Sequence, residues 1–338
     1  MTITESSPST LHDRAAALST LGRWSAANEN LPWQPAPDSR PMHWRYRDLR
    51  PLAIAAADMI KGDRAALRVL TLINPGHQRE AVVGHLYSGL QIINRGEGMT
   101  PHRHAPTALR YMHEGDGAWT AVGGIKMYLD PRDVVVTPAG QWHEHGNDSP
   151  TGSPAIWQDC ANDPLVASMS ATQFELHPGD THLEPHVLAH DRNHRNPHEP
   201  LLYKWNDVLR ALHRQSRTQA PDPHLAYRHT LHTLHTAGTH DPVTPVIDAA
   251  FTLLPAGTHT QPMRRTASTV LIGAQGLSTV HIDDNHYQCG EGDTVAVPSW
   301  STVSYSNDTP EPAVLFEFSD APTIAALGLY REEKDTNR

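Results

Sequence analysis

Two short histidine pairs are the part of this sequence best suited to chemistry. His102 and His104 form the first pair, and His143 and His145 form the second. Side chains two residues apart on a β-strand point to the same face, so each pair can turn both imidazoles toward one point. Neutral imidazoles are common ligands of divalent first-row metals. The spacing therefore predicts a metal centre of three imidazoles, with coordination positions left open for chemistry.

A small β-barrel would bring the two pairs side by side. Residues 84–175 contain many short apolar runs separated by turn residues, a pattern typical of antiparallel sandwiches and barrels. Gly123 and Gly124 separate two of these runs and predict a hairpin turn, because glycine adopts positive φ at little cost. The second histidine pair follows a strand that turns a corner at Pro138 and Gly140.

The residues around the histidines resemble the two cupin motifs. Gly-x5-His-x-His and Pro-x-Gly-x2-His-x3-Asn are matched by Gly96, His102, His104, Pro138, Gly140, His143 and Asn147. Many cupins carry a glutamate ligand shortly after the first pair, but residues 105–110 read Ala-Pro-Thr-Ala-Leu-Arg. This absence favours the three-histidine branch. One departure is Arg132, which stands where cupins usually have glycine and predicts a slightly different turn.

Further short motifs in the sequence resemble those of the gentisate and salicylate 1,2-dioxygenases. The resemblance is densest over residues 64–165 and thins to the level of the fold through 245–330. It rests on Gly89-Leu-Gln91, His102-Arg-His104, Ala108-Leu-Arg110 and Trp142-His143-Glu-His145-Gly. It implies an all-β fold with helical additions: a bicupin, with two jelly-roll barrels and an N-terminal helical arm.

We expect four segments in the chain. They are an N-terminal helical arm with a first strand (residues 1–80), a catalytic cupin barrel (81–176), a connector containing a helix (177–244) and a second, metal-free cupin barrel (245–330). Apolar residues at helical spacing predict helices over Thr10–Ala27, Leu52–Met59 and Leu201–Arg217. The connector has histidines at every fourth position from His182 to His198; prolines interrupt the run, which favours a solvated connector over a metal-binding helix.

The second barrel is predicted from an internal repeat. The run from Gly290 to Pro298 parallels the approach to the second histidine pair. Aligning the two halves places Gln261, Met263 and Val303 where the first barrel has His102, His104 and His143. No metal triad survives this alignment, so we expect a structural role for the second barrel, with His259 as a surface or core residue.

Arg110 and His145 are the expected catalytic side chains. Arg110 lies on the strand after the first histidine pair, where a fixed guanidinium can hold a substrate carboxylate through two hydrogen bonds. A buried arginine without an anion would be costly, which favours this role over packing. His145 shares the face of His143 one pair further along, which suits an acid, a base or a hydrogen-bond partner for the substrate.

Other substrate contacts are predicted with open alternatives. Arg64 and Arg68 match arginines that contact substrate in the resembled family, although a solvated charged face would give the same pattern. Gln91 resembles a family residue that contacts bound substrate. Asp159 either orients a ligand imidazole or is a surface aspartate.

Composition excludes several classes of partner. The chain has 338 residues, enough for two cores, and a net charge of −10, which disfavours nucleic acid. It has two cysteines, no long apolar run and no secretory signal at its start, which together predict a cytoplasmic protein with no disulfide framework and no membrane partner.

These features predict a ring-cleaving dioxygenase. Three neutral imidazoles leave a dication's charge uncompensated, so an anionic substrate that chelates through a carboxylate and an ortho-hydroxyl would bind well. Fe(II) suits both imidazoles and oxygen activation, and we expect one ion per chain. The resemblance implies gentisate, salicylate or 5-substituted salicylates such as 5-nitrosalicylate, cleaved between the carboxyl- and hydroxyl-bearing carbons with both atoms of O2 incorporated, by a homotetramer or homodimer. The alternatives are a non-catalytic cupin that binds metal or a small anion, and a cupin isomerase or hydrolase that uses another metal.

Overall fold

The computed structural model describes residues 8–22, 32–62, 67–77, 80–178, 186–187, 201–232 and 242–334. The chain divides into two compact units, Met1–Ala36 and Pro37–Arg338. The described part of the first unit holds helix α1 (Pro8–Ala17). The second unit holds the barrels and the helices α2 (Tyr46–Met59), α3 (Asp163–Ser168), α4 (Trp205–Thr218) and α5 (Ala321–Ala326).

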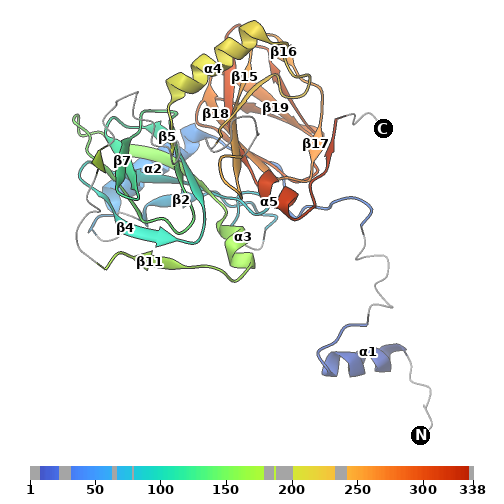
Figure 1. Ribbon diagram of the computed structural model, residues 1–338. Coiled ribbons are helices and arrows are strands. Elements are labelled where there is room, and N and C mark those ends of the chain that lie inside the picture. Colours follow the sequence, from blue (N-terminus) through green and yellow to red (C-terminus); the bar gives the residue numbers. More distant parts are fainter. Residues whose placement is uncertain are drawn as a thin grey trace, which may run out of the picture. The chain divides into compact units, whose positions relative to one another are not determined.

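The first barrel consists of two sheets whose inner faces share one apolar core (Figure 1). Its first sheet contains, in spatial order, β13 (Leu202–Tyr203), β8 (Val134–Thr137), β5 (Ala108–Glu114), β10 (Ala155–Ala161), β3 (Tyr87–Ile93) and β2 (Val69–Thr71). Its second sheet contains β11 (Phe174–Leu176), β4 (Gly98–His104), β9 (His143–Asn147), β6 (Ala118–Val122), β7 (Ile125–Tyr128) and β12 (His186–Val187).

The second barrel repeats this plan. Its larger sheet contains β1 (Met42–Trp44), β21 (Thr294–Val297), β18 (Thr269–Gln275), β23 (Ala313–Ser319), β15 (Asp248–Leu254) and β14 (Tyr227–Thr230). Its smaller sheet contains β16 (Thr258–His259), β22 (Val303–Asn307), β19 (Ser278–Ile282) and β20 (Asn285–Cys289). A separate pair joins β17 (Arg264–Arg265) to β24 (Glu332–Glu333). The all-β bicupin fold predicted from the sequence is therefore confirmed.

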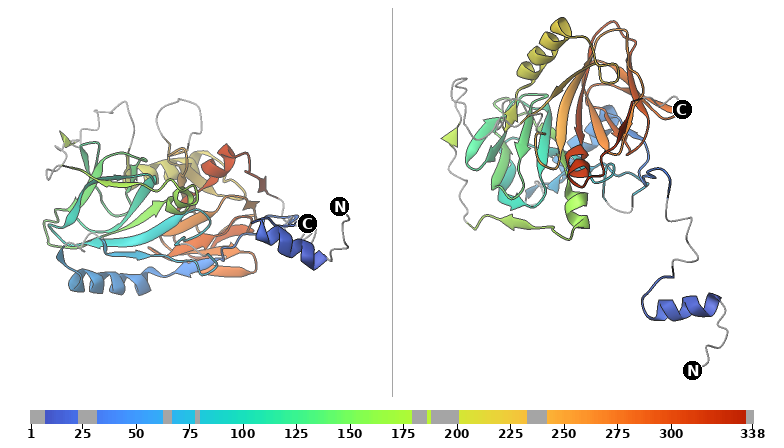
Figure 2. Two further views of the ribbon diagram at one scale, coloured as in Figure 1. Left: turned by 90° about the horizontal axis from the view of Figure 1, so that it is seen from below. Right: turned by 45° about the vertical axis from the view of Figure 1, so that its right-hand side comes forward.

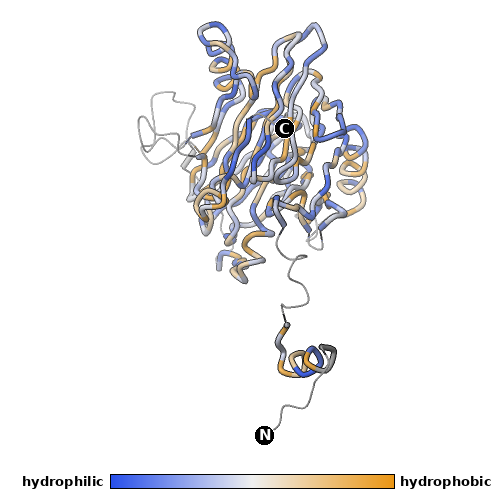
Figure 3. The backbone as a smooth tube through the Cα atoms, turned by 90° about the vertical axis from the view of Figure 1, so that its right-hand side faces the viewer, coloured by the Kyte–Doolittle hydropathy of each residue, from blue (hydrophilic) through white to orange (hydrophobic). Residues whose placement is uncertain are grey.

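The two barrels share an apolar junction. The outer face of the first sheet of the first barrel meets that of the larger sheet of the second barrel. Their shared cluster includes Leu109 and Tyr111 from the first barrel and Phe251 and Phe316 from the second. The Tyr111 and Phe316 rings stack with centroids 5.2 Å apart. Helix α4 adds Trp205 to the same cluster, and Figure 2 shows this helix lying along the two barrels. Hydrophobic and hydrophilic residues interleave along the chain of the barrels (Figure 3).

The segment boundaries expected from the sequence are crossed by several strands. Strand β1 comes from the predicted N-terminal arm but pairs with β21 of the second barrel. Strand β13 comes from the predicted connector but pairs with β8 of the first barrel. The predicted helices differ mainly in where they begin or end: α1 ends at Ala17, and α2 begins at Tyr46. The connector histidine run lies outside the described residues apart from the backbone of β12.

Two turn predictions had different outcomes. Gly123 and Gly124 form the expected two-residue hairpin, with φ of 57° and 84°. The prediction for Arg132 was wrong, because this residue adopts the left-handed conformation itself, with φ of 72°. Its side chain donates from Nε to the Ala274 carbonyl (2.6 Å) and from Nη2 to Glu291 (2.9 Å). These bonds to the second barrel help to offset the backbone strain.

Strand register corrects the alignment of the two halves. Met263 lies opposite Val303 in the second barrel, as His102 lies opposite His143 in the first. Met263 is therefore the counterpart of His102, not of His104, and Arg265 takes the place of His104. The alignment from sequence was shifted by two residues because the loop before β17 carries no motif to fix it. His259 is 65% exposed and pairs with Asp308, as expected for a surface residue.

No helix in the described part of the chain is both long enough and apolar enough to span a membrane.

Gly273 on β18 and Gly290, directly after β20, give a matched test of packing in the second barrel. A Cβ on Gly273 would lie 1.8 Å from the Gly290 carbonyl oxygen, whereas a Cβ on Gly290 would come no closer than 3.7 Å to any neighbour. We expect Gly273→Ala to lower the free energy of unfolding by about 1–3 kcal/mol through overpacking. Gly290→Ala should change it by less than about 0.5 kcal/mol. Urea denaturation measures both, and equal stability of the two variants would contradict the register described here.

Candidate metal centre

The two histidine pairs meet because β4 and β9 pair directly. His102 lies opposite His143, and Gly98 lies opposite Gly146. A Cβ on Gly98 would lie 2.4 Å from the His145 carbonyl oxygen, so this approach requires glycine. A register shift between Met99 and His102 bends β4 between the two contacts. The barrel expected from the sequence therefore brings both pairs to one place.

Three imidazoles converge on one point. Ligand atoms of His102, His104 and His143 all lie within 4.8 Å of one another, and this is the only such group of possible metal ligands in the described residues. Each Nδ1 donates to a backbone carbonyl, of Thr100 (2.8 Å), Pro106 (2.8 Å) and Gln141 (2.9 Å) respectively. These bonds fix the tautomer and leave each Nε2 lone pair for a metal.

Burial keeps two of these imidazoles neutral. Desolvation lowers the pKa of His102 to about 4 and that of His143 to about 2. Neighbouring imidazoles lower both pKa values further, because two protonated rings would repel each other. At neutral pH both rings are therefore uncharged, which is the form that binds a metal.

His145 lies beside the three imidazoles but is not one of them. Its ring centroid is 5.5 Å from that of His102 and 6.3 Å from that of His143. The side chain is 3% exposed, and neither ring nitrogen has a hydrogen-bond partner among the described residues. Burial lowers the pKa of His145 well below its usual value. A buried imidazole without a partner is costly unless something else binds it.

Arg110 reaches the same interior from the opposite sheet. Its Nε donates to Asp159 (2.8 Å) and its Nη1 to the Thr120 hydroxyl (2.9 Å). Its guanidinium carbon lies 4.7 Å from the centroid of Trp157. The buried guanidinium therefore has an anion of its own, so the cost of an unpaired charge no longer argues for substrate binding. No hydrogen bond from Nη2 to a described residue is found.

Gln91, Asp159 and Arg64 were also predicted to contribute to the site, and each has a separate outcome. Gln91 accepts a hydrogen bond from the Trp157 indole (3.1 Å), which ties it to the surroundings of Arg110. Asp159 pairs with Arg110 and not with an imidazole, because the ligand Nδ1 atoms already donate to carbonyls. With a side chain that is 17% exposed it is not a surface aspartate either, so neither of the two alternatives describes it. Arg64 lies outside the described residues.

The contacts of Arg68 do not fit the substrate-binding role that was one of its two alternatives. Its guanidinium pairs with Glu97 and donates to the carbonyls of Ile92 (3.2 Å) and Ile60 (3.0 Å). Arg68 is 3% exposed. It therefore joins the end of α2 to β3, and Glu97 already supplies the anionic partner of its guanidinium.

Sequence reasoning missed three neighbours of the site. Trp157 packs edge-on against His145, with ring centroids 5.5 Å apart. Thr120 holds Arg110 from the second sheet. Phe174 on the edge strand β11 stacks on His102 at 5.5 Å and is 52% exposed, so it lies at the open side of the centre. Alternation along β10 could have indicated Trp157, but no local signal marks the other two.

The metal group can be tested by removing one ligand. We expect His104→Ala to lower the metal content after Fe(II) or Zn(II) loading to less than about a tenth, because two imidazoles cannot hold the ion tightly. His113→Gln is the matched control, since His113 is a largely buried imidazole on β5 that bonds Gln158 and lies outside the group. Elemental analysis measures both variants. Full metal content in the His104 variant would contradict the ligand set.

Comparison with known proteins agrees with this geometry. Residues 89–158 match the model of the cupin domain family. The chain is similar to a 5-aminosalicylate 1,2-dioxygenase of Comamonas (29% identity, covering 96% of this chain and 89% of the relative) and to a gentisate 1,2-dioxygenase of Ralstonia (29%, covering 96% and 94%). The structure of a salicylate 1,2-dioxygenase from Pseudaminobacter salicylatoxidans superimposes with a TM-score of 0.84 at 25% identity, over 98% of this chain and 99% of that chain. Sequence and fold thus agree over nearly the whole length in making this chain similar to the gentisate and salicylate 1,2-dioxygenases, and the fold is that of a bicupin.

Proposed function

We propose that this protein is an Fe(II)-dependent dioxygenase that opens the ring of a 2-hydroxybenzoate-type acid between the carboxyl- and hydroxyl-bearing carbons. The observation that carries the proposal is the group of three converging imidazoles, beside a buried guanidinium and an imidazole without a hydrogen-bond partner among the described residues. The relatives act on gentisate, 5-aminosalicylate and 5-nitrosalicylate, which share the carboxylate and ortho-hydroxyl. Both atoms of O2 enter the product, so no external reductant is needed.

The donor set fits a ferrous ion. Three neutral imidazoles neither cancel the charge of a dication nor fill its coordination sphere. Bound iron would supply a cation to which an anionic hydroxy acid and O2 can both bind. His102, His104 and His143 are the residues that would hold it.

Arg110 is proposed to orient the substrate carboxylate. Asp159 and Thr120 hold the guanidinium in place, and Trp157 lies against its face, so its position is fixed before substrate arrives. Nη2 is then the donor proposed to bind a carboxylate. Gln91, joined to the same indole, is proposed to contact the bound acid from β3.

His145 is proposed to handle the proton of the substrate hydroxyl. Because burial keeps its ring neutral, one nitrogen can accept this proton when the hydroxyl oxygen binds the cation. A bound substrate would also supply the hydrogen-bond partner that the ring otherwise lacks.

The remaining parts of the proposal follow from the similarity to the dioxygenases. Iron as the metal, assembly into homotetramers and a cytoplasmic location are included here as expectations from that similarity. A non-catalytic cupin would need the three imidazoles alone, whereas the buried Arg110 and unpartnered His145 favour an enzyme. An isomerase or hydrolase with another metal would use the same ligands but would consume no O2.

Oxygen uptake separates these alternatives. After anaerobic Fe(II) loading, we expect uptake with gentisate, salicylate, 5-substituted salicylates or 1-hydroxy-2-naphthoate, and none with benzoate or 3-hydroxybenzoate, because these two acids lack the ortho-hydroxyl needed for chelation. An oxygen electrode with product analysis measures the panel. Metal binding without uptake on any 2-hydroxy acid would overturn the proposed function.

Arg110 gives a second test of the proposal. We expect Arg110→Lys to lower kcat/KM by a factor of about 10²–10³, because lysine cannot bond Asp159, Thr120 and a carboxylate at once. Arg103→Lys is the matched control, since Arg103 lies on β4, is 39% exposed and pairs with Glu175. It should stay within about twofold of the wild type. Steady-state oxygen uptake measures both, and equal effects would exclude a special role for Arg110.

A further inference from the structure

Trp157 contacts all three side chains that are proposed to bind the substrate around the metal centre. Its ring lies against Arg110, with the guanidinium carbon 4.7 Å from the ring centroid, and it packs edge-on against His145 at 5.5 Å. Its Nε1 donates to Oε1 of Gln91 (3.1 Å). Trp157 is 1% exposed and is the largest of the fully buried side chains in the described part of the chain. The one polar atom of this buried ring is therefore directed at Gln91.

This hydrogen bond decides how the Gln91 amide is oriented. An indole N–H can only donate, so the atom that it meets must be the amide oxygen and not the amide nitrogen. The oxygen and the nitrogen of a planar amide point in different directions. Holding Oε1 against Trp157 therefore turns Nε2, with its two hydrogens, away from the indole.

Strand register places this pair next to the Arg110–Asp159 pair. Trp157 lies opposite Gln91 of β3, and Asp159 lies opposite Arg110 of β5. Side chains two residues apart on a strand share a face, so Trp157 and Asp159 both point from β10 into the same interior. Gln91 and Arg110 therefore approach that interior from the two strands that flank β10.

The second barrel lacks the tryptophan–glutamine pair. Thr252 lies opposite Leu315 there, as Gln91 lies opposite Trp157 in the first barrel. The Thr252 hydroxyl is buried and has no hydrogen-bond partner among the described residues. The barrel without the three imidazoles therefore also has no side chain that holds a polar group in this orientation.

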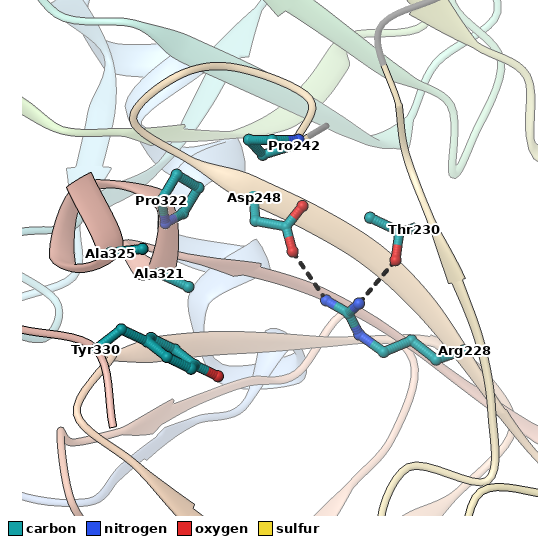
Figure 4. Close-up of a pocket in the computed structure, with 8 residues that line it drawn as sticks. All are labelled: Arg228, Thr230, Pro242, Asp248, Ala321, Pro322, Ala325 and Tyr330. Atoms are coloured by element: carbon teal, nitrogen blue, oxygen red, sulfur yellow. Dashed lines mark hydrogen bonds and ion pairs between the residues drawn. The ribbon is translucent and has the colours of Figure 1, made fainter. Parts of the chain in front are cut away.

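The guanidinium of the second barrel is also bonded differently. Arg228 donates from Nη2 to Asp248 (3.1 Å) and from Nη1 to Thr230 (2.7 Å), as Figure 4 shows, and from Nε to Glu317 (2.6 Å). All three of its nitrogens are engaged within the barrel. The fixed amide beside an arginine is thus a feature of the barrel that holds the metal centre.

A chelating hydroxy acid presents acceptor atoms to its surroundings. A carboxylate has only acceptor oxygens, and the hydroxyl oxygen also becomes an acceptor once its proton has moved to His145 as proposed. An amide N–H beside these oxygens stabilises the anion, whereas an amide carbonyl in the same place would repel it. The orientation of one amide therefore changes the affinity of the site for an anionic acid.

We propose that Trp157 is a positioning residue: it holds the oxygen of the Gln91 amide so that the N–H groups of Gln91 donate to the bound hydroxy acid. This inference rests on the proposed function, because it requires an anionic acid at the metal centre. Trp157 acts through Gln91, and the ring contacts with Arg110 and His145 keep the indole in place.

Anaerobic calorimetric titration of the Fe(II)-loaded full chain with gentisate and with salicylate tests this role without turnover. Trp157→Phe removes the indole N–H but keeps an aromatic ring beside Arg110 and His145. We expect it to weaken binding of the acids about five- to tenfold, because the amide then loses the donor that holds its oxygen.

Trp119→Phe is the matched control for this change. Trp119 is a 9% exposed indole of the same barrel, and its Nε1 has no hydrogen-bond partner among the described residues. Its ring packs against Gly146, on the face of β9 opposite to the one that carries His143 and His145. The control variant should bind both acids as the wild type does.

A double-mutant cycle separates positioning from packing. Gln91→Leu should weaken binding about tenfold, and adding Trp157→Phe to it should change binding by less than about twofold, because both changes break the same interaction. If Trp157 only packs against Arg110 and His145, the two effects multiply, and this result would overturn the proposal.

Gln91→Glu tests the donor without altering the apolar core, and it carries the test if Trp157→Phe fails to fold. A carboxylate accepts the indole N–H but has no donor of its own, so binding should weaken at least as much as in Gln91→Leu. Wild-type protein that binds neither acid would overturn the proposed function and this inference with it. Wild-type binding together with unchanged binding by Trp157→Phe or by Gln91→Glu would overturn this inference alone.

Discussion

The close pairing of β4 with β9 is the contact on which the site depends. It requires a glycine at position 98, because any side chain there would collide with the His145 carbonyl. It sets His102 against His143, and the three Nδ1–carbonyl bonds then hold the rings with their Nε2 atoms turned to one point. The backbone thus orients the ligands by itself. No carboxylate is needed to orient the imidazoles, which explains why Asp159 bonds Arg110 and not an imidazole.

The two barrels show how one strand arrangement can be filled in different ways. In the first, neutral imidazoles and the Arg110–Asp159 pair face the interior. In the second, Met263 and Val303 replace two ligands, and Arg265 stands in place of the third. Register also sets Glu317 of the second barrel where the first has Asp159, but its partner Arg228 comes from β14. A buried carboxylate has been kept in both barrels, paired each time with an arginine from a different strand.

The junction between the barrels includes one residue with a strained backbone, Arg132. Arg132 adopts a left-handed backbone where the equivalent turn of the second barrel has Gly292, with φ of 79°. A glycine at position 132 would remove the strain but would also remove two hydrogen bonds to the second barrel. The strain at Arg132 is therefore accompanied by hydrogen bonds between the barrels, whose facing sheets also share an apolar core. The two barrels are thus joined by hydrogen bonds from this turn as well as by apolar packing.

The barrel fold, the hairpin at Gly123 and Gly124, and the three converging imidazoles could be predicted from the amino-acid sequence. These follow from local patterns, because strand periodicity and motif spacing are properties of neighbouring residues. The partners of the isolated charges, in contrast, depend on how the sheets pack. Arg68 binds Glu97, and Asp159 binds Arg110, because partners distant in sequence become neighbours only when the sheets close. The shifted alignment of Met263 has the same cause: cross-strand register is set by pairing between strands, and no single strand encodes it.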